Sequence, residues 1–260
     1  MSEIILCEDH DRIRVLSINR PGALNAMNNA VFQGIAERLA EAEESSNTAV
    51  VIITGIGKAF CAGQDLEEFQ VLAQGGSAEH QFPHMLKQLT NFKKPLIAAV
   101  NGLGVGIGMT MLAHCDLVLM AKDARLKTPF PQLGLAPEAG SSCTFIERMG
   151  WQNAAYTLLS GRWFSAVECL EMGLVWRLEE AQELMPNAMA LASEIAANPI
   201  PSLIATKELM LASGRPHDAW AAHQRESKVY EELLGAPANN EALAAFVEKR
   251  EANFANVPGI

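Results

Sequence analysis

A run of glycines after a buried segment is the part of the sequence best suited to hold a developing negative charge. Residues 95–100 form an apolar run typical of a buried strand, and glycines then occupy every second position over 102–108 before an apolar helical pattern begins. Such a turn lets a ligand or another backbone approach closely, and the first amides of the following helix lack partners within the helix. Two interpretations stay open here: an oxyanion-binding turn that exposes the amide of Ile107, and a tightly packed turn without a ligand.

The loop over residues 59–66 resembles this glycine turn. It also follows a buried apolar run, residues 49–54, and it carries small residues. It could expose the backbone amide of Gln64 in the way the later turn could expose that of Ile107. Two amides that converge on one point form an oxyanion hole, although a loop of this kind taken alone is more often only a connector.

Glu138 is the candidate for proton transfer. It follows Pro137, which is well placed at the first position of a helix predicted to run to about Met149. A helix N-terminus favours the charged carboxylate, which is also the ordinary structural role of a first-turn glutamate. Its apolar neighbours, among them Leu135, would instead raise the pKa toward that of a useful base. These two effects oppose each other, and the sequence does not rank them.

Several familiar cofactor and catalytic motifs are missing. The glycine turn fits no G-x-G-x-x-G register, Lys58 lies in no Walker A motif, and there is no G-x-S-x-G elbow. His80 and His84 are four residues apart, but Pro83 between them argues against a shared helical face. We therefore expect no metal and no cofactor separate from the substrate.

Composition restricts the class of protein. The 260 residues are 49% apolar and 19% charged, which is typical of a globular chain, and the net charge of −10 argues against a nucleic-acid partner. The five cysteines form no C-x-x-C pair, which favours reduced, buried thiols in a cytoplasmic protein. We see neither a secretory signal pattern nor an apolar run of membrane-spanning length, so we expect no membrane association.

Strand and helix patterns alternate up to about residue 178, and only helices follow. This order predicts an α/β fold with a helical C-terminal appendage, which we divide into a core over 1–200 and a helical region over 201–260. Residues 70–84 are expected to form an irregular surface segment. The expected strands are 3–7, 12–19, 49–54, 95–101, 116–121 and 124–128. The first expected helix begins near Asn25 or Asn28. The further expected helices cover 84–92, 137–149, 151–159, 165–172, 180–198, 201–213, 216–234 and 239–254.

Three segments in order resemble the signatures of the crotonase (enoyl-CoA hydratase/isomerase) superfamily. They are residues 60–66, residues 101–116 and residues 133–140. The resemblance implies a repeated ββα spiral core, a C-terminal helical trimerisation region and an acyl-CoA substrate. It also implies a homotrimer or a dimer of trimers, in which the amides of Gln64 and Ile107 polarise the thioester carbonyl.

Departures from the family pattern shape the expected activity. Hydratases of this superfamily carry two glutamates that activate water, at the positions of Thr110 and Phe130, and this chain has neither. Its Pro137-Glu138 resembles enoyl-CoA delta isomerases of the peroxisomal type, whose single catalytic glutamate aligns with Glu138. The implied activity is conversion of 3-enoyl-CoA to trans-2-enoyl-CoA. The alternatives are a ring-epoxide (1,2-epoxyphenylacetyl-CoA) isomerase, a hydratase-like acyl-CoA enzyme and a non-catalytic acyl-CoA binder.

The resemblance also implies residues that contact the substrate or its CoA moiety. Lys249 and Phe246 match the C-terminal CoA-contacting pattern, with reach toward a neighbouring subunit, although a solvated helix residue is an equally good interpretation of Lys249. The remaining expected contacts are Ala23, Leu24, Ala62, Gly63, Gln64, Asp65, Leu66, Gly106 and Phe130.

Overall fold

Two β-sheets form the centre of the protein, for which the computed structural model describes residues 3–73 and 80–257. The larger sheet has six strands in the order β1-β2-β3-β5-β7-β10. Its first two strands pair antiparallel and the others are parallel. The central strands carry almost only apolar side chains because both faces of the sheet are covered. The strands are β1 (Ile5–His10), β2 (Ile13–Ile18), β3 (Val50–Gly55), β5 (Leu96–Val100), β7 (Leu117–Ala121) and β10 (Arg177–Glu179).

The smaller sheet has four short strands in the order β4-β6-β8-β9. Consecutive strands alternate between the sheets: β3, β5 and β7 belong to the larger one, and each is followed by a strand of the smaller one. This alternation is the repeated spiral, and it confirms the predicted α/β fold class. The four strands are β4 (Ala59–Cys61), β6 (Leu103–Val105), β8 (Arg125–Lys127) and β9 (Trp163–Ser165), of which only β8 was predicted as a strand.

Helices cover the larger sheet and enclose the site. Helix α1 (Asn29–Glu44) begins as predicted at Asn28, whose side chain accepts a hydrogen bond from the amide of Val31. Helix α7 (Leu184–Ala196) packs on β2, β3, β5 and β7, and α3 (Phe82–Asn91) packs on α1. The shorter elements are η1 (Pro21–Ala23), α2 (Leu66–Ala73), α4 (Ile107–Thr110), η2 (Met111–His114), η3 (Phe130–Leu133), α6 (Ala166–Glu171) and η4 (Phe254–Asn256).

Several predicted boundaries are wrong, among them the end of the helix expected over 239–254, which stops at Glu248. The expected helix start at Pro137 is displaced, because α5 (Ser141–Ser160) begins only after two residues with positive φ, Ala139 at 60° and Gly140 at 71°. The expected irregular segment over 70–84 is helical in its first part, since α2 extends to Ala73, and α3 begins before its end. Residues 74–79 of that segment lie outside the described residues.

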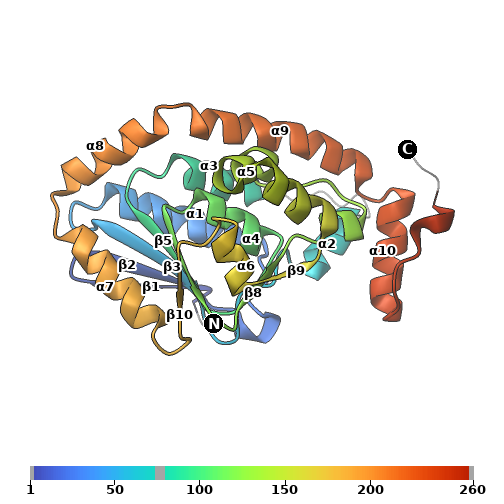
Figure 1. Cartoon of the computed structure of the whole chain (residues 1–260), viewed down its shortest axis with the longest axis horizontal. Helices are drawn as coiled ribbons and strands as arrows, with labels where there is room; N and C mark the ends of the chain where they lie inside the picture. Colours follow the sequence, from blue (N-terminus) through green and yellow to red (C-terminus); the bar gives the residue numbers. More distant parts are fainter. Residues whose placement is uncertain (1–2, 74–79, 258–260) are drawn as a thin grey trace.

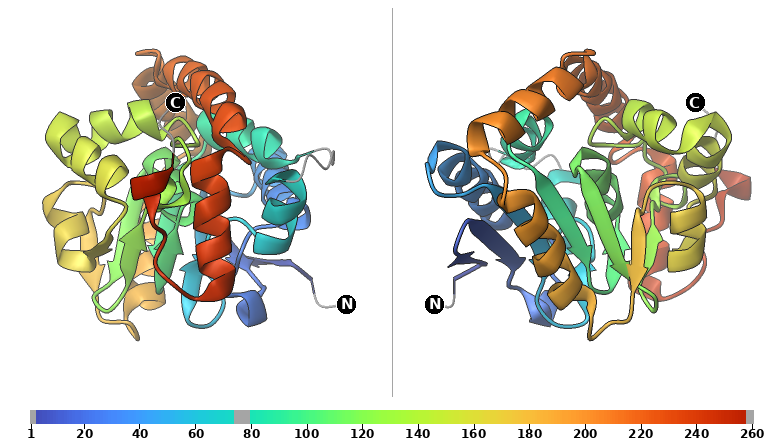
Figure 2. Two further views of the ribbon diagram at one scale, coloured as in Figure 1. Left: turned by 90° about the vertical axis from the view of Figure 1, so that its right-hand side faces the viewer. Right: turned by 60° about the vertical axis from the view of Figure 1, so that its left-hand side comes forward.

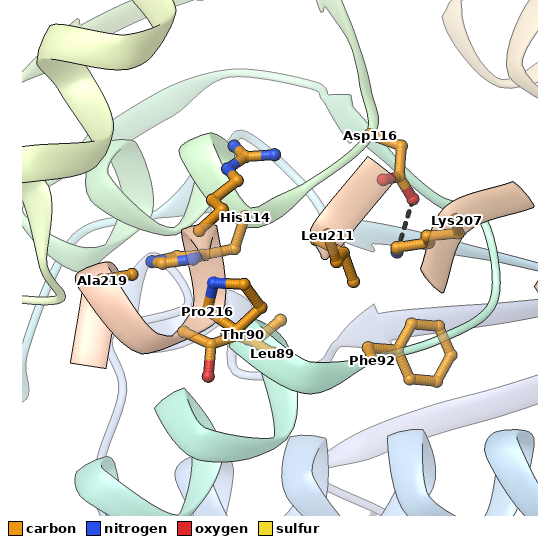
Figure 3. A pocket seen from close by; sticks show the side chains of 10 residues that line it. Leu89, Thr90, Phe92, His114, Asp116, Lys207, Leu211, Pro216 and Ala219 are labelled. Atoms are coloured by element: carbon orange, nitrogen blue, oxygen red, sulfur yellow. Dashed lines mark hydrogen bonds and ion pairs between the residues drawn. The ribbon is translucent and has the colours of Figure 1, made fainter. Parts of the chain in front are cut away.

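The C-terminal region contains the helices α8 (Ile200–Leu211), α9 (Arg215–Leu233) and α10 (Pro237–Glu248), and η4 follows them. Helix α9 passes over α3 and α5, and α10 lies beyond its end (Figure 1). A partly buried ion pair joins α8 to the core: Nζ of Lys207 lies 2.6 Å from Oδ2 of Asp116, beside Phe92 and Leu211 (Figure 3). The division at residue 200 stays a prediction.

Within residues 3–73 and 80–257, no single helix has the length and apolarity needed to span a bilayer. Helices α7 and α8 meet that requirement only as a pair, with a bend of 99° between them.

Candidate active site

A cleft of about 670 Å³ opens between the two glycine-bearing loops and the C-terminal helix α10. Segments far apart in the sequence meet here: the loop after β4, the start of α4, η3 and α10. Most residues predicted from the sequence line this cleft. They are Ala62, Gly63, Gln64, Leu66, Gly106, Ile107, Phe130, Glu138 and Phe246.

The amide of Gln64 is free because its neighbours take the available backbone partners. Residues 63–65 pair with Met27 as an isolated parallel bridge: the Met27 amide donates to the Gly63 carbonyl over 2.8 Å, and the Asp65 amide donates to the Met27 carbonyl over 2.9 Å. In such a bridge, the amide between these two contacts points away from the partner strand. Among the described residues, the backbone amide of Gln64 has no acceptor, whereas its side-chain Nε2 lies 3.1 Å from Nε2 of His80.

The amide of Ile107 is likewise without an acceptor among the described residues, because Ile107 is the first residue of α4. Gly106 precedes it with φ of 53°, a conformation that favours glycine, and donates its own amide to the Lys127 carbonyl over 2.9 Å. A Cβ atom at Gly108 would clash with the carbonyl of Cys61. Gly108 therefore allows the two loops to pack closely, and Ile107 lines the cleft, while the oxyanion role of its amide stays a prediction.

Glu138 lies beside this amide and lines the same cleft. A Cβ atom built on Gly106 would lie 3.6 Å from Oε1 of Glu138. Burial, together with the charge of Glu226, raises the pKa of Glu138 to about 8. Because the helix starts only at Ser141, burial outweighs the dipole effect that the sequence placed against it.

A second cavity of about 240 Å³ meets the cleft at the same residues. Gln64, Glu138 and Tyr230 line both spaces. The second cavity has an aromatic wall, in which the rings of Phe82 and His223 meet edge to face at 5.5 Å between centroids. Glu138 therefore lies at the junction of a large cleft and a smaller, aromatic compartment.

Four predicted binding residues do not line the cleft. Asp65 pairs instead with Nη1 of Arg20 over 2.9 Å, while Ala23 and Leu24 lie in and just after η1, next to the loop that carries Ala62. Lys249 is exposed and ends α10 with φ of 55°. Its neighbour Arg250 lines the cleft and forms ion pairs with Glu241 and Glu248, each over 2.6 Å.

Tyr230, Lys127 and Arg250 line the cleft without having been predicted from the sequence. Tyr230 lies on α9, 92 residues after Glu138 in the numbering, and no local motif marks it. Its pKa is raised by burial and by the charge of Glu138, so the phenol stays neutral near pH 7. Arg250 could have been found from the sequence, because it directly follows Lys249, which matched the C-terminal CoA-contacting pattern of the family.

The positions of the two missing hydratase glutamates differ in their surroundings. Phe130 lines the cleft with an apolar ring. Thr110 is fully buried, and its hydroxyl has no hydrogen-bond partner among the described residues. In the two cavity linings, the carboxylates other than Glu138 are those of Glu231 and Glu251, and both residues are exposed.

Comparisons with known proteins agree with this architecture. The family model described as "Enoyl-CoA hydratase/isomerase" matches residues 8–257. The chain is 32% identical to a 2,3-dehydroadipyl-CoA hydratase of Escherichia coli over 254 residues, which cover 98% of this chain and 99% of that protein. It is 30% identical to a 1,2-epoxyphenylacetyl-CoA isomerase of Escherichia coli over 262 residues, covering 98% and 99% of the two chains.

Among solved structures, an enoyl-CoA hydratase/isomerase from Pseudoalteromonas atlantica T6c superposes with a TM-score of 0.91 at 32% identity, covering 97% of this chain and 100% of that one. The relatives carry both hydratase and isomerase names, so the resemblance to peroxisomal-type isomerases in particular stays a prediction. The match over nearly the whole length, together with the shared fold, shows that this chain belongs to the enoyl-CoA hydratase/isomerase family.

Proposed function

We propose that the protein is an acyl-CoA double-bond isomerase that converts 3-enoyl-CoA to trans-2-enoyl-CoA, with Glu138 as the proton shuttle. The observation that carries this proposal is the position of the Glu138 carboxylate beside the amide-bearing start of α4, at the junction of the two cavities. A buried carboxylate next to two free amides is suited to remove a proton adjacent to a thioester.

The proposed reaction needs one carboxylate. Glu138 removes a proton from C2 of the acyl chain. The electron pair of that C–H bond forms a double bond between C1 and C2, and the carbonyl electrons move onto the thioester oxygen, in conjugation with the double bond between C3 and C4. The amides of Gln64 and Ile107 donate to that oxygen and stabilise the dienolate. The protonated Glu138 then returns its proton at C4, which leaves the double bond between C2 and C3.

The surroundings of Glu138 suit both halves of this transfer. With a pKa raised to about 8, the carboxylate is a stronger base than an ordinary glutamate, and the carboxylic acid it becomes is stable enough to hold the proton. The active form of the resting enzyme is the carboxylate, so kcat/KM should rise with pH and level off above about 8. Hydration is disfavoured, because neither Thr110 nor Phe130 can activate a water molecule.

CoA would occupy the large cleft, with the acyl group directed into the second cavity. Lys127 and Arg250 are the cations in the lining of the cleft that could face its phosphates. Phe246 supplies an apolar surface on α10. The proposed CoA contacts of Ala23, Leu24, Asp65 and Lys249 have no support from the cavity lining.

The variant Glu138→Gln tests the proposal, with a 3-enoyl-CoA as substrate and exchange of the C2 proton in deuterated water as a second readout. We expect a loss of at least ~10³-fold in both, because the base is removed while the shape of the site is kept. Glu44→Gln is the matched control, since Glu44 is exposed at the end of α1. Near wild-type turnover in Glu138→Gln would overturn the assignment, and binding without any exchange in the wild type would favour a non-catalytic acyl-CoA binder.

A ring-epoxide isomerase acting on an aromatic acyl-CoA is the second candidate. The observation in its favour is the aromatic wall of the second cavity. The ring centroid of Phe82 lies 6.0 Å from that of His80 and 5.5 Å from that of His223. A relative with a 1,2-epoxyphenylacetyl-CoA isomerase name matches over nearly the full chain. Turnover of aliphatic 3-enoyl-CoA esters compared with ring-epoxide esters separates the two candidates.

We also propose that the chain assembles as a homotrimer or a dimer of trimers. Large apolar side chains are exposed on neighbouring helices α5 and α6 and shortly after α6, which supports burial against another copy. These residues, called here the apolar face, are Trp151, Tyr156, Leu159, Val167, Leu170 and Trp176.

A further inference from the structure

We propose that Glu226 of α9 is a positioning residue for Glu138: it holds the turn that presents Glu138 to the cleft, and it places a second negative charge behind that turn. The inference rests on the proposed function, since it assigns a role relative to the proposed proton shuttle. Glu226 is buried and lines neither cavity, so it does not face the substrate.

Both carboxylate oxygens of Glu226 bind the backbone that follows Glu138. Oε2 accepts a hydrogen bond from the amide of Gly140 over 2.7 Å, and Oε1 accepts one from the amide of Ser142 over 2.8 Å. These amides lie at the start of α5, where amides have no partner within the helix and where a negative charge is favoured. Glu226 therefore joins α9 to the turn between Glu138 and α5.

The turn needs to be held because its backbone is in a conformation that a side chain disfavours. Ala139 has φ of 60°, in the left-handed region, directly after Glu138. Its carbonyl accepts a hydrogen bond from Nε2 of His114 over 2.8 Å. A Cβ atom at the next residue, Gly140, would clash with the carbonyl of Ala219. The turn is thus fixed from two sides, by His114 of η2 and by Glu226 of α9.

His114 is suited to this role as a neutral donor. It is buried, and it lines a small cavity together with Pro216 and Ala219 of α9 (Figure 3). Burial lowers the pKa of His114 to about 4, so the imidazole carries no charge near neutrality. A neutral imidazole donates to the Ala139 carbonyl without adding a positive charge near Glu138.

Besides burial, Glu226 is the neighbouring charge that raises the pKa of Glu138. His80, His223 and Glu231 also line the second cavity with Glu138, but burial lowers the pKa of both histidines, and Glu231 is exposed. Cys61 of β4 and Tyr230 of α9 also face Glu138, but burial raises the pKa of Cys61 to about 12 and that of Tyr230 still further. Arg225 on the same helix and Cys143 of α5 face Glu226. Burial raises the pKa of Glu226, the amides of Gly140 and Ser142 act against that rise, and the ionised form of Glu226 opposes ionisation of Glu138.

Two variants separate the effect of the Glu226 charge from the effect of its side-chain length. Glu226→Gln keeps the size but removes the charge and one acceptor. We expect the acid limb of its kcat/KM profile to move to lower pH by about half a unit or more, with a plateau reduced about tenfold. Glu226→Asp keeps the charge but shortens the side chain, so its plateau should fall while the acid limb stays in place. Glu232→Gln is the matched control, because Glu232 is exposed on the same helix.

A readout independent of turnover is the titration of Glu138 in the unliganded protein, followed through the infrared band of its protonated carboxyl. The band is identified by its absence in Glu138→Gln, and its midpoint should move to lower pH in Glu226→Gln. A wild type without isomerisation would refute the proposed function, while this titration would still decide the role of Glu226.

An unshifted midpoint and acid limb in Glu226→Gln would reduce Glu226 to a structural cap of α5 and overturn the inference. If Glu226→Gln does not fold, Glu226→Asp tests the inference. An undiminished kcat/KM plateau in Glu226→Asp would show that the turn does not need a carboxylate at the distance that glutamate provides, and would overturn the inference.

Discussion

Burial gives Glu138 its proposed reactivity, and at the same time its ionised form lowers the free energy of unfolding. The carboxylate lies beside the amide-bearing start of α4, with another carboxylate, Glu226, behind its turn, and its pKa is raised to about 8. Removing water and adding a like charge both disfavour the ionised form. The proposed activity needs that ionised form, so function and stability place opposite demands on this residue.

Glu138→Gln should stabilise the protein, and more so at higher pH. In the folded state the pKa of Glu138 is about 8, whereas an ordinary glutamate has 4.5. The folded protein therefore binds this proton more tightly, and the resulting stability is fully present below about 4.5 and is lost as pH rises through about 8. Glutamine does not titrate, so the variant loses nothing over this window.

Thermal unfolding at the two ends of the window measures this effect. The Tm of the variant minus that of the wild type should grow by at least ~2 °C from the acid to the alkaline end. Glu44→Gln should show no such trend, because that side chain is exposed. An equal difference in Tm at both ends would mean that Glu138 titrates normally in the folded protein.

The sequence located the proposed reactive residues but not their electrostatics. Gln64, Ile107 and Glu138 were each marked by a local pattern of small residues or by Pro137, and all three line the cleft. The direction of the Glu138 pKa could not be predicted, because it depends on whether a helix begins at that residue and on what covers it. Glu226 was not found, since it reaches the turn from 86 residues away in the chain.

Individual elements were largely predictable, apart from those that depend on contacts distant in sequence. Helix α1 and strands β3, β5 and β7 follow from their apolar patterns and from the cap at Asn28. Strand β9 has only three residues and exists through its pairing with β8. The start of α5 was misplaced because Ala139 takes a left-handed conformation, which its residue type does not signal.

Helix α10 encloses the cleft of its own chain, although the family resemblance suggested reach toward a neighbour. Residues of α10 and of the segment after it line the cleft opposite the glycine-bearing loops. Phe246 is 59% exposed and lines the cleft, whereas the adjacent Val247 is 65% exposed and does not. A bound CoA ester would therefore cover Phe246 and leave Val247 in water.

Phe246→Ala should weaken substrate binding and leave the chemical step unchanged. We expect KM to rise about tenfold, equivalent to about 1.4 kcal/mol of lost contact, with kcat within twofold of the wild type. Val247→Ala is the matched control on the same helix and should keep both constants. A fall in kcat at unchanged KM would instead mean that α10 orders the reacting groups.

At the scale of the whole molecule, the apolar face consists of large apolar side chains that remain exposed to water in a single chain. Helices α5 and α6 lie side by side at one edge of the molecule (Figure 2). Trp151 is 71% and Leu159 is 77% exposed on α5, and Val167 is 53% exposed on α6. Exposed apolar patches of this kind mark sites of protein–protein contact. The alternation of strands and helices predicted the fold, but the sequence could not show which apolar residues stay outside the core.

Trp151→Glu combined with Leu159→Glu should dissociate the proposed homotrimer into monomers. Each copy carries a net charge of −10, so association has to overcome electrostatic repulsion, and two buried glutamates would add an unpaired charge at each contact. Sedimentation velocity measures the change in mass. Gln152→Glu adds the same charge to an exposed polar position of α5 and should leave the assembly intact. A trimer that persists in the double variant would place the contact elsewhere, with the exposed Leu209 and Met210 of α8 as the next surface to test.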